Sequence, residues 1–129
     1  MAGSGRGVDS GRVDSTHART AYAHRARLRL VHDVEPAEVG AAVTTALCGH
    51  WGHEGSCRWP HNNDIRATDG SAEFRTVFVA PPTEEGEVRS LVDAALNGDP
   101  RWAVEESGAR DLTSDERALG ERLATTPQP

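Results

Sequence analysis

The stretch Ile65-Arg66-Ala67-Thr68-Asp69-Gly70-Ser71-Ala72-Glu73-Phe74 decides the fold of this chain. Asp69-Gly70 is a strong signal for a two-residue hairpin turn, since both central positions of that turn need a positive φ. Pairing across the turn sets apolar residues opposite apolar ones and arginine opposite glutamate, which is chemically sensible. We therefore predict a hairpin of two strands, 65–68 and 72–80. The expected pairs are Thr68 with Ser71, Ala67 with Ala72, Arg66 with Glu73, and Ile65 with Phe74.

A strand and a helix are expected before the hairpin. Apolar residues alternate with charged ones over 27–34, which predicts a half-buried strand. Pro36 suits the first turn of a helix, because its missing N–H costs nothing there. The apolar residues that follow repeat at helical spacing, and the helix should stop by Gly49. This apolar stripe is formed by Val39, Val43 and Leu47, with Ala42 and Ala46 beside them.

Two helices and one strand are expected after the hairpin. Thr83 is predicted to cap a helix with an acidic first turn, which ends at Asn97-Gly98. A short strand is predicted over 101–105. The capping box formed by Thr113 and Glu116 then starts a last helix. The apolar stripe of the first of these helices comprises Val88, Leu91, Val92, Ala95 and Leu96, and the last helix should bury Leu119 and Leu123.

The resulting order is β-α-β-β-α-β followed by an extra C-terminal helix. This order predicts an α+β fold of the ferredoxin-like, split βαβ kind, with two helices on one sheet face. Residues 1–24 are rich in Gly and Ser, with isolated apolar residues, and are predicted to be a disordered tail. Residues 25–125 form the single α+β domain, and residues 126–129 are a frayed C-terminus.

The second face of the predicted sheet carries arginines and three valines, Val31, Val77 and Val79. A face of this kind is expected to be covered, and the commonest cover is a second copy of the chain. We therefore predict a homodimer that forms through these valines. An RNA-binding sheet would need aromatic residues for base stacking, and this face has none.

Composition and charge exclude several classes of protein. The formal net charge of -6 argues against nucleic acid as a partner. No apolar run approaches the roughly 20 residues that span a bilayer, so no membrane association is expected. The N-terminus has no apolar segment typical of a signal peptide. With only 2 cysteines, the chain lacks a disulfide framework, and we predict a cytoplasmic protein.

One segment gathers chemically versatile side chains. It reads Cys48-Gly-His-Trp-Gly-His-Glu-Gly-Ser-Cys-Arg-Trp-Pro-His61 and holds both cysteines of the chain. Thiolate and imidazole are the donors that zinc prefers, and the interspersed glycines would let a loop fold back on itself. The segment therefore predicts a site for zinc or a similar transition metal, with a structural or sensing role. The candidate ligands are Cys48, His50, His53, Cys57 and His61.

Four neighbouring side chains receive supporting roles in this hypothesis. Glu54 is a candidate hydrogen-bond acceptor for a ligand imidazole. Arg58 could stack on Trp59 or bind an anion. Trp51 and Trp59 are candidates for contact with a partner, or they could pin the loop to the domain.

Three further interpretations of the segment stay open. The protein could be a non-catalytic accessory protein that docks through its Trp-rich loop. It could be a thiol enzyme in which His53 or His61 activates Cys57, although the sequence shows no oxyanion hole and does not favour an enzyme. Finally, Cys48 and Cys57 could form a reversible disulfide, without the tight C-x-x-C spacing of redox motifs.

Overall fold

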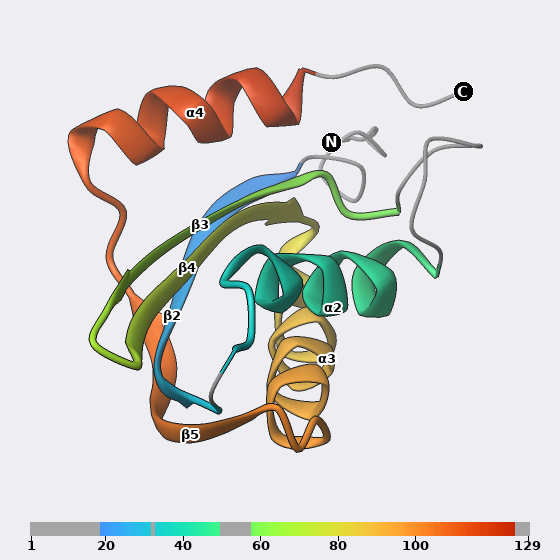
Figure 1. The fold of residues 1–129 in the computed structure, drawn as a ribbon. Helices are drawn as coiled ribbons and strands as arrows, with labels where there is room; N and C mark the ends of the chain where they lie inside the picture. The colour runs from blue at the N-terminus through green and yellow to red at the C-terminus, as the bar shows by residue number, and fades with distance from the viewer. Residues whose placement is uncertain (1–18, 32, 50–57, 126–129) are drawn as a thin grey trace, which may run out of the picture.

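The computed structural model describes residues 19–31, 33–49 and 58–125, which form an α+β fold (Figure 1). A four-stranded antiparallel sheet combines with three α-helices in these ranges. No helix within them is long and apolar enough to cross a membrane. The elements are β2 (Thr20–Leu30), α2 (Ala37–Cys48), β3 (His61–Thr68), β4 (Ser71–Ala80), the short 3-10 helix η1 (Pro82–Glu84), α3 (Glu85–Asn97), β5 (Trp102–Arg110) and α4 (Ser114–Ala124).

The strands lie in the order β3-β4-β2-β5, and each strand is antiparallel to its neighbours. Only β3 and β4 are consecutive both in the chain and in the sheet. The other two connections run through α2 and α3, which lie on the same side of the sheet (Figure 1).

The hairpin has the predicted register. Thr68 pairs with Ser71, and Ile65 pairs with Phe74. Asp69 has a φ of 52° and Gly70 a φ of 84°, as the two central positions of the predicted turn require. The turn chemistry and the cross-strand pairs therefore specify this part of the sheet.

The first strand begins earlier than predicted. β2 starts at Thr20, inside the segment 1–24 that composition predicted to be disordered, and it ends at Leu30 rather than at Val34. β2 is a central strand with ladder partners on both sides, β4 and β5. These partners stabilise small and polar residues that carry little apolar signal of their own. Residues 1–18 and 126–129 lie outside the described residues.

The apolar core lies between the sheet and the helices α2 and α3. Each predicted helical stripe is buried here: Val39, Val43 and Leu47 of α2 and Val88, Val92 and Leu96 of α3 are at most 3% exposed. The start of α3 differs from the prediction, since Thr83 lies within η1 and the position before the helix is Glu84. The strand residues of this core are Ala26, Leu28, Ala72, Phe74, Phe78, Ala80 and Trp102.

Helix α4 lies on the opposite face of the sheet, where it contacts β2 and β4 (Figure 1). Val77 and Val79 are both 0% exposed within the single chain. The predicted homodimer face is therefore not open, because the C-terminal helix of the same chain lies on it; Val31 alone remains exposed, at 52%. The capping box of Thr113 and Glu116 is present as predicted.

Candidate functional site

The predicted metal-binding segment starts at the C-terminal end of α2. Cys48 is the last residue of this helix, and Gly49 ends it with a φ of 80°. The Cys48 side chain is half-buried and disulfide-bonded. Five of the predicted site residues lie outside the described residues: His50, Trp51, His53, Glu54 and Cys57.

His61 anchors the other end of the segment. Its Nδ1 lies 3.0 Å from the backbone oxygen of Trp59, and its Nε2 lies 3.0 Å from Oγ1 of Thr44 in α2. The carbonyl only accepts, so Nδ1 carries the proton and Nε2 accepts from the Thr44 hydroxyl. Burial lowers the pKa of His61, although the hydrogen bond to Trp59 acts in the opposite direction. Both ring nitrogens of His61 therefore have partners within the domain, and neither has a lone pair left for a metal.

Trp59 is a core residue rather than a docking residue. It is 3% exposed and belongs to the hydrophobic cluster under α2 and α3. Its indole Nε1 donates to Oε1 of Glu84 over 2.8 Å. The Trp59 side chain thus pins the end of the loop to the start of α3, and it is not available to a partner.

Arg58 is exposed and lies over Trp59. Its guanidinium carbon is 4.4 Å from the indole centroid, as expected for cation–π stacking. The same guanidinium lies 3.4 Å from a carboxylate oxygen of Glu84 and 3.8 Å from one of Glu87. Arg58 therefore closes over the Trp59–Glu84 contact, and its charge is already balanced.

Within residues 19–31, 33–49 and 58–125, no three His, Cys, Asp or Glu side chains are close enough to hold a metal ion. The metal hypothesis consequently depends on the donors between Gly49 and Arg58, which lie outside the described ranges.

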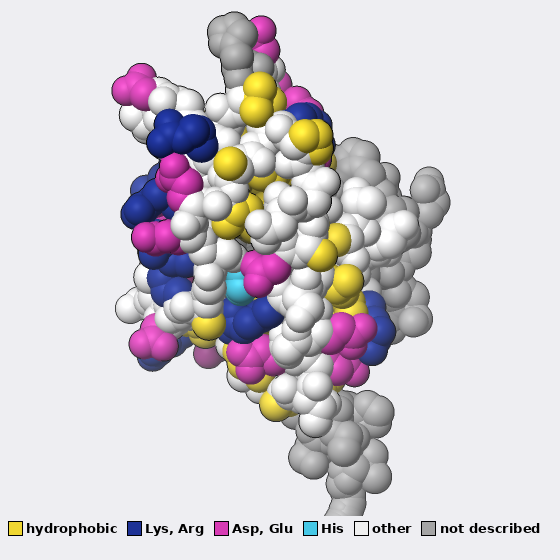
Figure 2. Space-filling model, turned by 90° about the horizontal axis from the view of Figure 1, so that it is seen from below, with side chains coloured by type: hydrophobic (Ala, Val, Ile, Leu, Met, Phe, Trp, Pro, Cys, Tyr) yellow, Lys and Arg dark blue, Asp and Glu magenta, His cyan; other side chains and the backbone are white. Residues whose placement is uncertain are grey.

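A second cluster, absent from the sequence-based prediction, surrounds His24. This histidine is 2% exposed on the core-facing side of β2. Its Nε2 lies 2.9 Å from Oγ of Ser107 on β5 and 3.2 Å from Oδ1 of Asp93 on α3. Its Nδ1 lies 3.0 Å from an N–H group of Arg89. Figure 2 shows that histidine, basic and acidic side chains lie next to one another near the centre of the face in view.

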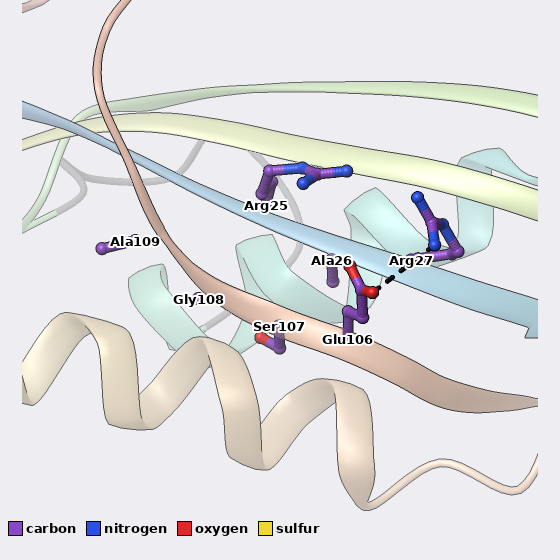
Figure 3. A pocket seen from close by; sticks show the side chains of 7 residues that line it. All are labelled: Arg25, Ala26, Arg27, Glu106, Ser107, Gly108 and Ala109. Carbon is purple, nitrogen blue, oxygen red and sulfur yellow. Dashed lines mark ion pairs between the residues drawn. The ribbon is translucent and has the colours of Figure 1, made fainter.

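A bulge in β5 aims Ser107 at this cluster. Leu28 pairs with Val104, but Arg27 pairs with Glu106, so Glu105 is an extra residue in the ladder. The extra residue reverses which side chains of β5 lie on each face of the sheet. Ser107 therefore points toward α3, while Glu106 points toward Arg27 on the other face (Figure 3). A shallow depression of about 360 Å³ lies beside this bulge.

The hydrogen bonds of the His24 cluster exclude a serine-nucleophile arrangement. Arg89 can only donate, so Nδ1 of His24 accepts and Nε2 carries the proton. Nε2 then donates to Ser107 and Asp93, and the Ser107 hydroxyl donates to Asp93 over 2.5 Å. His24 has no lone pair directed at Ser107 and does not serve as its base. Burial lowers the pKa of His24; the Asp93 carboxylate raises it to a lesser extent.

The predicted disordered tail included His24, so this cluster was not among the predicted sites. The signal was present, since His24 continues the alternation of Leu28 and Ala26 backwards by two residues. The bulge that brings Ser107 to the same face has no comparable signal in the sequence.

Comparison with protein-family models and with curated protein sequences gives no relative. No protein-family model matches this chain, and no curated protein sequence is significantly similar to it. Functional evidence for this chain therefore comes from its own residues.

Proposed function

We propose that this protein binds zinc or a similar transition-metal ion through the loop that follows α2. The proposed ligands are Cys48, His50, His53 and Cys57. His61 is removed from the predicted set, because both of its nitrogens bond to Trp59 and Thr44. Two thiolates and two imidazoles are a complete donor set for a tetrahedral structural zinc site.

The observation that supports this proposal most is the clamp at the base of the loop. The Thr44–His61 hydrogen bond of 3.0 Å joins α2 to the first residue of β3. Cys48 lies four residues after Thr44, and Cys57 lies four residues before His61. A closed base of this kind lowers the entropic cost of bringing donors in the loop to one point.

The disulfide of Cys48 adds a redox condition to the proposal. A cysteine in a disulfide has no thiolate to donate, so the ion binds only after two-electron reduction of that bond. When bound, the ion would cross-link the loop through its cysteine and histidine ligands. We therefore propose that metal binding and disulfide formation exclude each other, which suits a structural or sensing role.

The scaffold of the proposed site is a ferredoxin-like, split βαβ domain. The strand order β3-β4-β2-β5 and the two helical crossovers on one face support this more specific assignment. Many unrelated activities share this architecture, so it carries no functional argument.

Elemental analysis of the full chain tests the proposal. The tag-free protein is reduced with a phosphine, loaded with zinc and desalted. We expect about one zinc ion per chain in the reduced protein and none in the oxidised protein. Cys57→Ser and His53→Ala should lose the ion, whereas His17→Ala, a histidine outside the loop, should retain it. A zinc content near zero in the reduced wild-type protein would overturn the proposal.

A further inference from the structure

Strand β3 forms one edge of the sheet and presents unpaired backbone groups. Val79 N–H donates to Pro60 C=O over 3.0 Å, and the hydrogen-bonded pairs then recur at every second residue. Asn62, Asp64 and Arg66 consequently direct their N–H and C=O groups toward β4. Asn63, Ile65 and Ala67 direct theirs outward, and among the described residues nothing pairs with these outward groups.

The two edges of the sheet differ in their protection. β5 carries the bulge at Glu105 and two acidic side chains, Glu105 and Glu106, features that discourage pairing with another strand. β3 is a regular strand of 8 residues without proline or bulge. It is therefore the edge that offers a template for another strand.

An apolar groove runs beside the β3 edge on the side of α2. Its volume is about 350 Å³. The helix contributes only small side chains to it, and Asn63 fixes its wall by donating to the Gly40 carbonyl and to Thr44, both over 3.1 Å. The lining residues are Ala37, Gly40, Ala41, Thr44, Asn63, Asp64, Ile65 and Phe74.

We propose that β3 pairs antiparallel with β3 of a second copy of this chain, with the two-fold axis at Ile65. The outward groups of Asn63, Ile65 and Ala67 allow only registers that pair odd-numbered residues with odd-numbered ones. An axis at Asp64 would place that carboxylate opposite itself, and an axis at Arg66 would do the same for the guanidinium.

The register centred on Ile65 is the one that the charges favour. It sets Asp64 opposite Arg66 of the second copy, twice in the dimer. In the single chain these two side chains are 49% and 85% exposed, and their closest charged atoms are 3.7 Å apart. They are thus free to exchange a weak contact within one strand for two contacts across the axis.

The groove receives an apolar side chain in the same register. Opposed residues in an antiparallel ladder lie on the same face of the sheet, so Ile65 of the second copy points to the side of α2. There it would lie beside Ile65 and near the groove formed by Ala37 and Ala41. The dimer would thus contain one continuous eight-stranded sheet, and it does not depend on the metal site.

Sedimentation equilibrium of the full chain tests this proposal, with variants that reverse the charges at Asp64 and Arg66. We expect a reversible monomer–dimer equilibrium for the wild-type protein. Asp64→Arg and Arg66→Asp should each weaken the dimer roughly ten- to a hundredfold, because like charges then oppose each other twice. An equimolar mixture of these two variants should form a heterodimer, and the double variant D64R/R66D should recover the homodimer. Glu121→Arg, which makes the same charge change on exposed α4, is the matched control and should dimerise as the wild type does.

A second variant covers the case in which a charge-reversed chain does not fold. Ala67→Pro removes an outward N–H and leaves the β3–β4 ladder intact, so it should fold and be monomeric. A wild-type protein that stays monomeric at all concentrations would overturn the proposal. So would an Asp64→Arg or Ala67→Pro variant that folds and dimerises like the wild type, or a Glu121→Arg variant that dissociates equally.

Discussion

The two faces of the sheet are covered by helices in two different ways. Under α2 and α3 the contacts are mostly apolar, with Phe74 and Phe78 at most 1% exposed, and the His24 cluster beside α3 is the polar exception. Under α4 the helix is held by a charged contact and by a close backbone approach. Glu116 of α4 accepts from Arg110 over 2.9 Å and lies 3.2 Å from Arg75, and Gly120 lies against Ala21. We therefore expect the first face to contribute more to the free energy of unfolding, whereas the contacts of Glu116 and Gly120 fix where α4 lies.

Beyond α4, the second face is a network of exposed ion pairs. Arg25 and Arg27 both donate to Glu73, over 2.7 and 2.9 Å, and Arg29 pairs with Glu105 over 3.0 Å. These groups are largely solvated, and pairs of this kind contribute little to stability. The arginines of this face are thus already paired with carboxylates of the same chain.

The largest expected effect comes from the apolar face. Phe78→Ala should destabilise the protein by about 3–5 kcal/mol, because the surrounding core cannot fill the cavity. Denaturant unfolding followed by tryptophan fluorescence measures the change. If Phe78→Ala costs no more than Val79→Ala on the α4 face, the two faces do not differ as described.

Gly120 tests the close approach of α4 to β2. A Cβ at this position would lie 2.5 Å from Cβ of Ala21. Gly120→Ala should therefore cost about 1–3 kcal/mol, although alanine favours helices. Gly86→Ala in α3 is the matched control, since a Cβ there meets nothing within 4 Å. That variant should be neutral or stabilising by up to about 1 kcal/mol in the same unfolding assay.

Glu116→Gln should weaken the attachment of α4 with a smaller cost, roughly 1–2 kcal/mol. Burial opposes ionisation of Glu116, but hydrogen bonds from Arg110 and the Thr113 N–H outweigh it, and its pKa is lowered from 4.5. A lowered carboxyl pKa contributes stability above pH 4.5 that is lost as the pH falls. The free energy of unfolding, measured from neutral to acid pH, should decrease less steeply in Glu116→Gln than in the wild-type protein. An equally steep decrease in both proteins would contradict this account.

The smallest expected effect is a pH dependence that originates at His24. Its pKa lies below 6.5 in the folded protein, mainly because of burial. Below pH 6.5 His24 takes up a proton in the unfolded chain but resists it in the folded protein. The protein therefore becomes less stable as the pH is lowered through that range. The conservative variant His24→Asn should reduce the slope of the unfolding free energy against pH, between neutral pH and the range in which Glu116 titrates. The pKa of His61 is also lowered by burial, so His61→Asn should reduce this slope as well.

Local sequence signals predicted the fold where a turn dipeptide, a capping box or a regular spacing of apolar residues determines the structure. Asp69-Gly70 set the hairpin register, and the Thr113–Glu116 box set the start of α4. The position of α4 could not be predicted, because it depends on Glu116 meeting Arg75 of β4, a residue far from it in the sequence. The start of β2 was missed for a related reason: the ladder to β4, joined by β5 from Ala23 onward, holds Thr20 to His24 in the sheet.

The candidate site was predictable only in its chemistry. The sequence identified thiol and imidazole groups between α2 and β3, and it proposed that Arg58 stacks on Trp59, as the structure has it. It could not show that Thr44 and Trp59 occupy both nitrogens of His61, because these contacts need the tertiary fold. The sequence offered two roles for Trp59, contact with a partner or pinning of the loop, and the structure has the second; it could not identify the anchoring residue Glu84, which is 25 residues away.

The absorption spectrum of cobalt(II) bound to the reduced full chain tests the proposed function most directly. Cobalt in a site of two thiolates and two imidazoles gives intense tetrahedral d–d bands and sulfur-to-cobalt charge-transfer bands. We predict that these bands saturate at about one equivalent of cobalt and are lost in Cys57→Ser but retained in His61→Asn. A spectrum that stays that of hydrated cobalt throughout the titration would contradict the account.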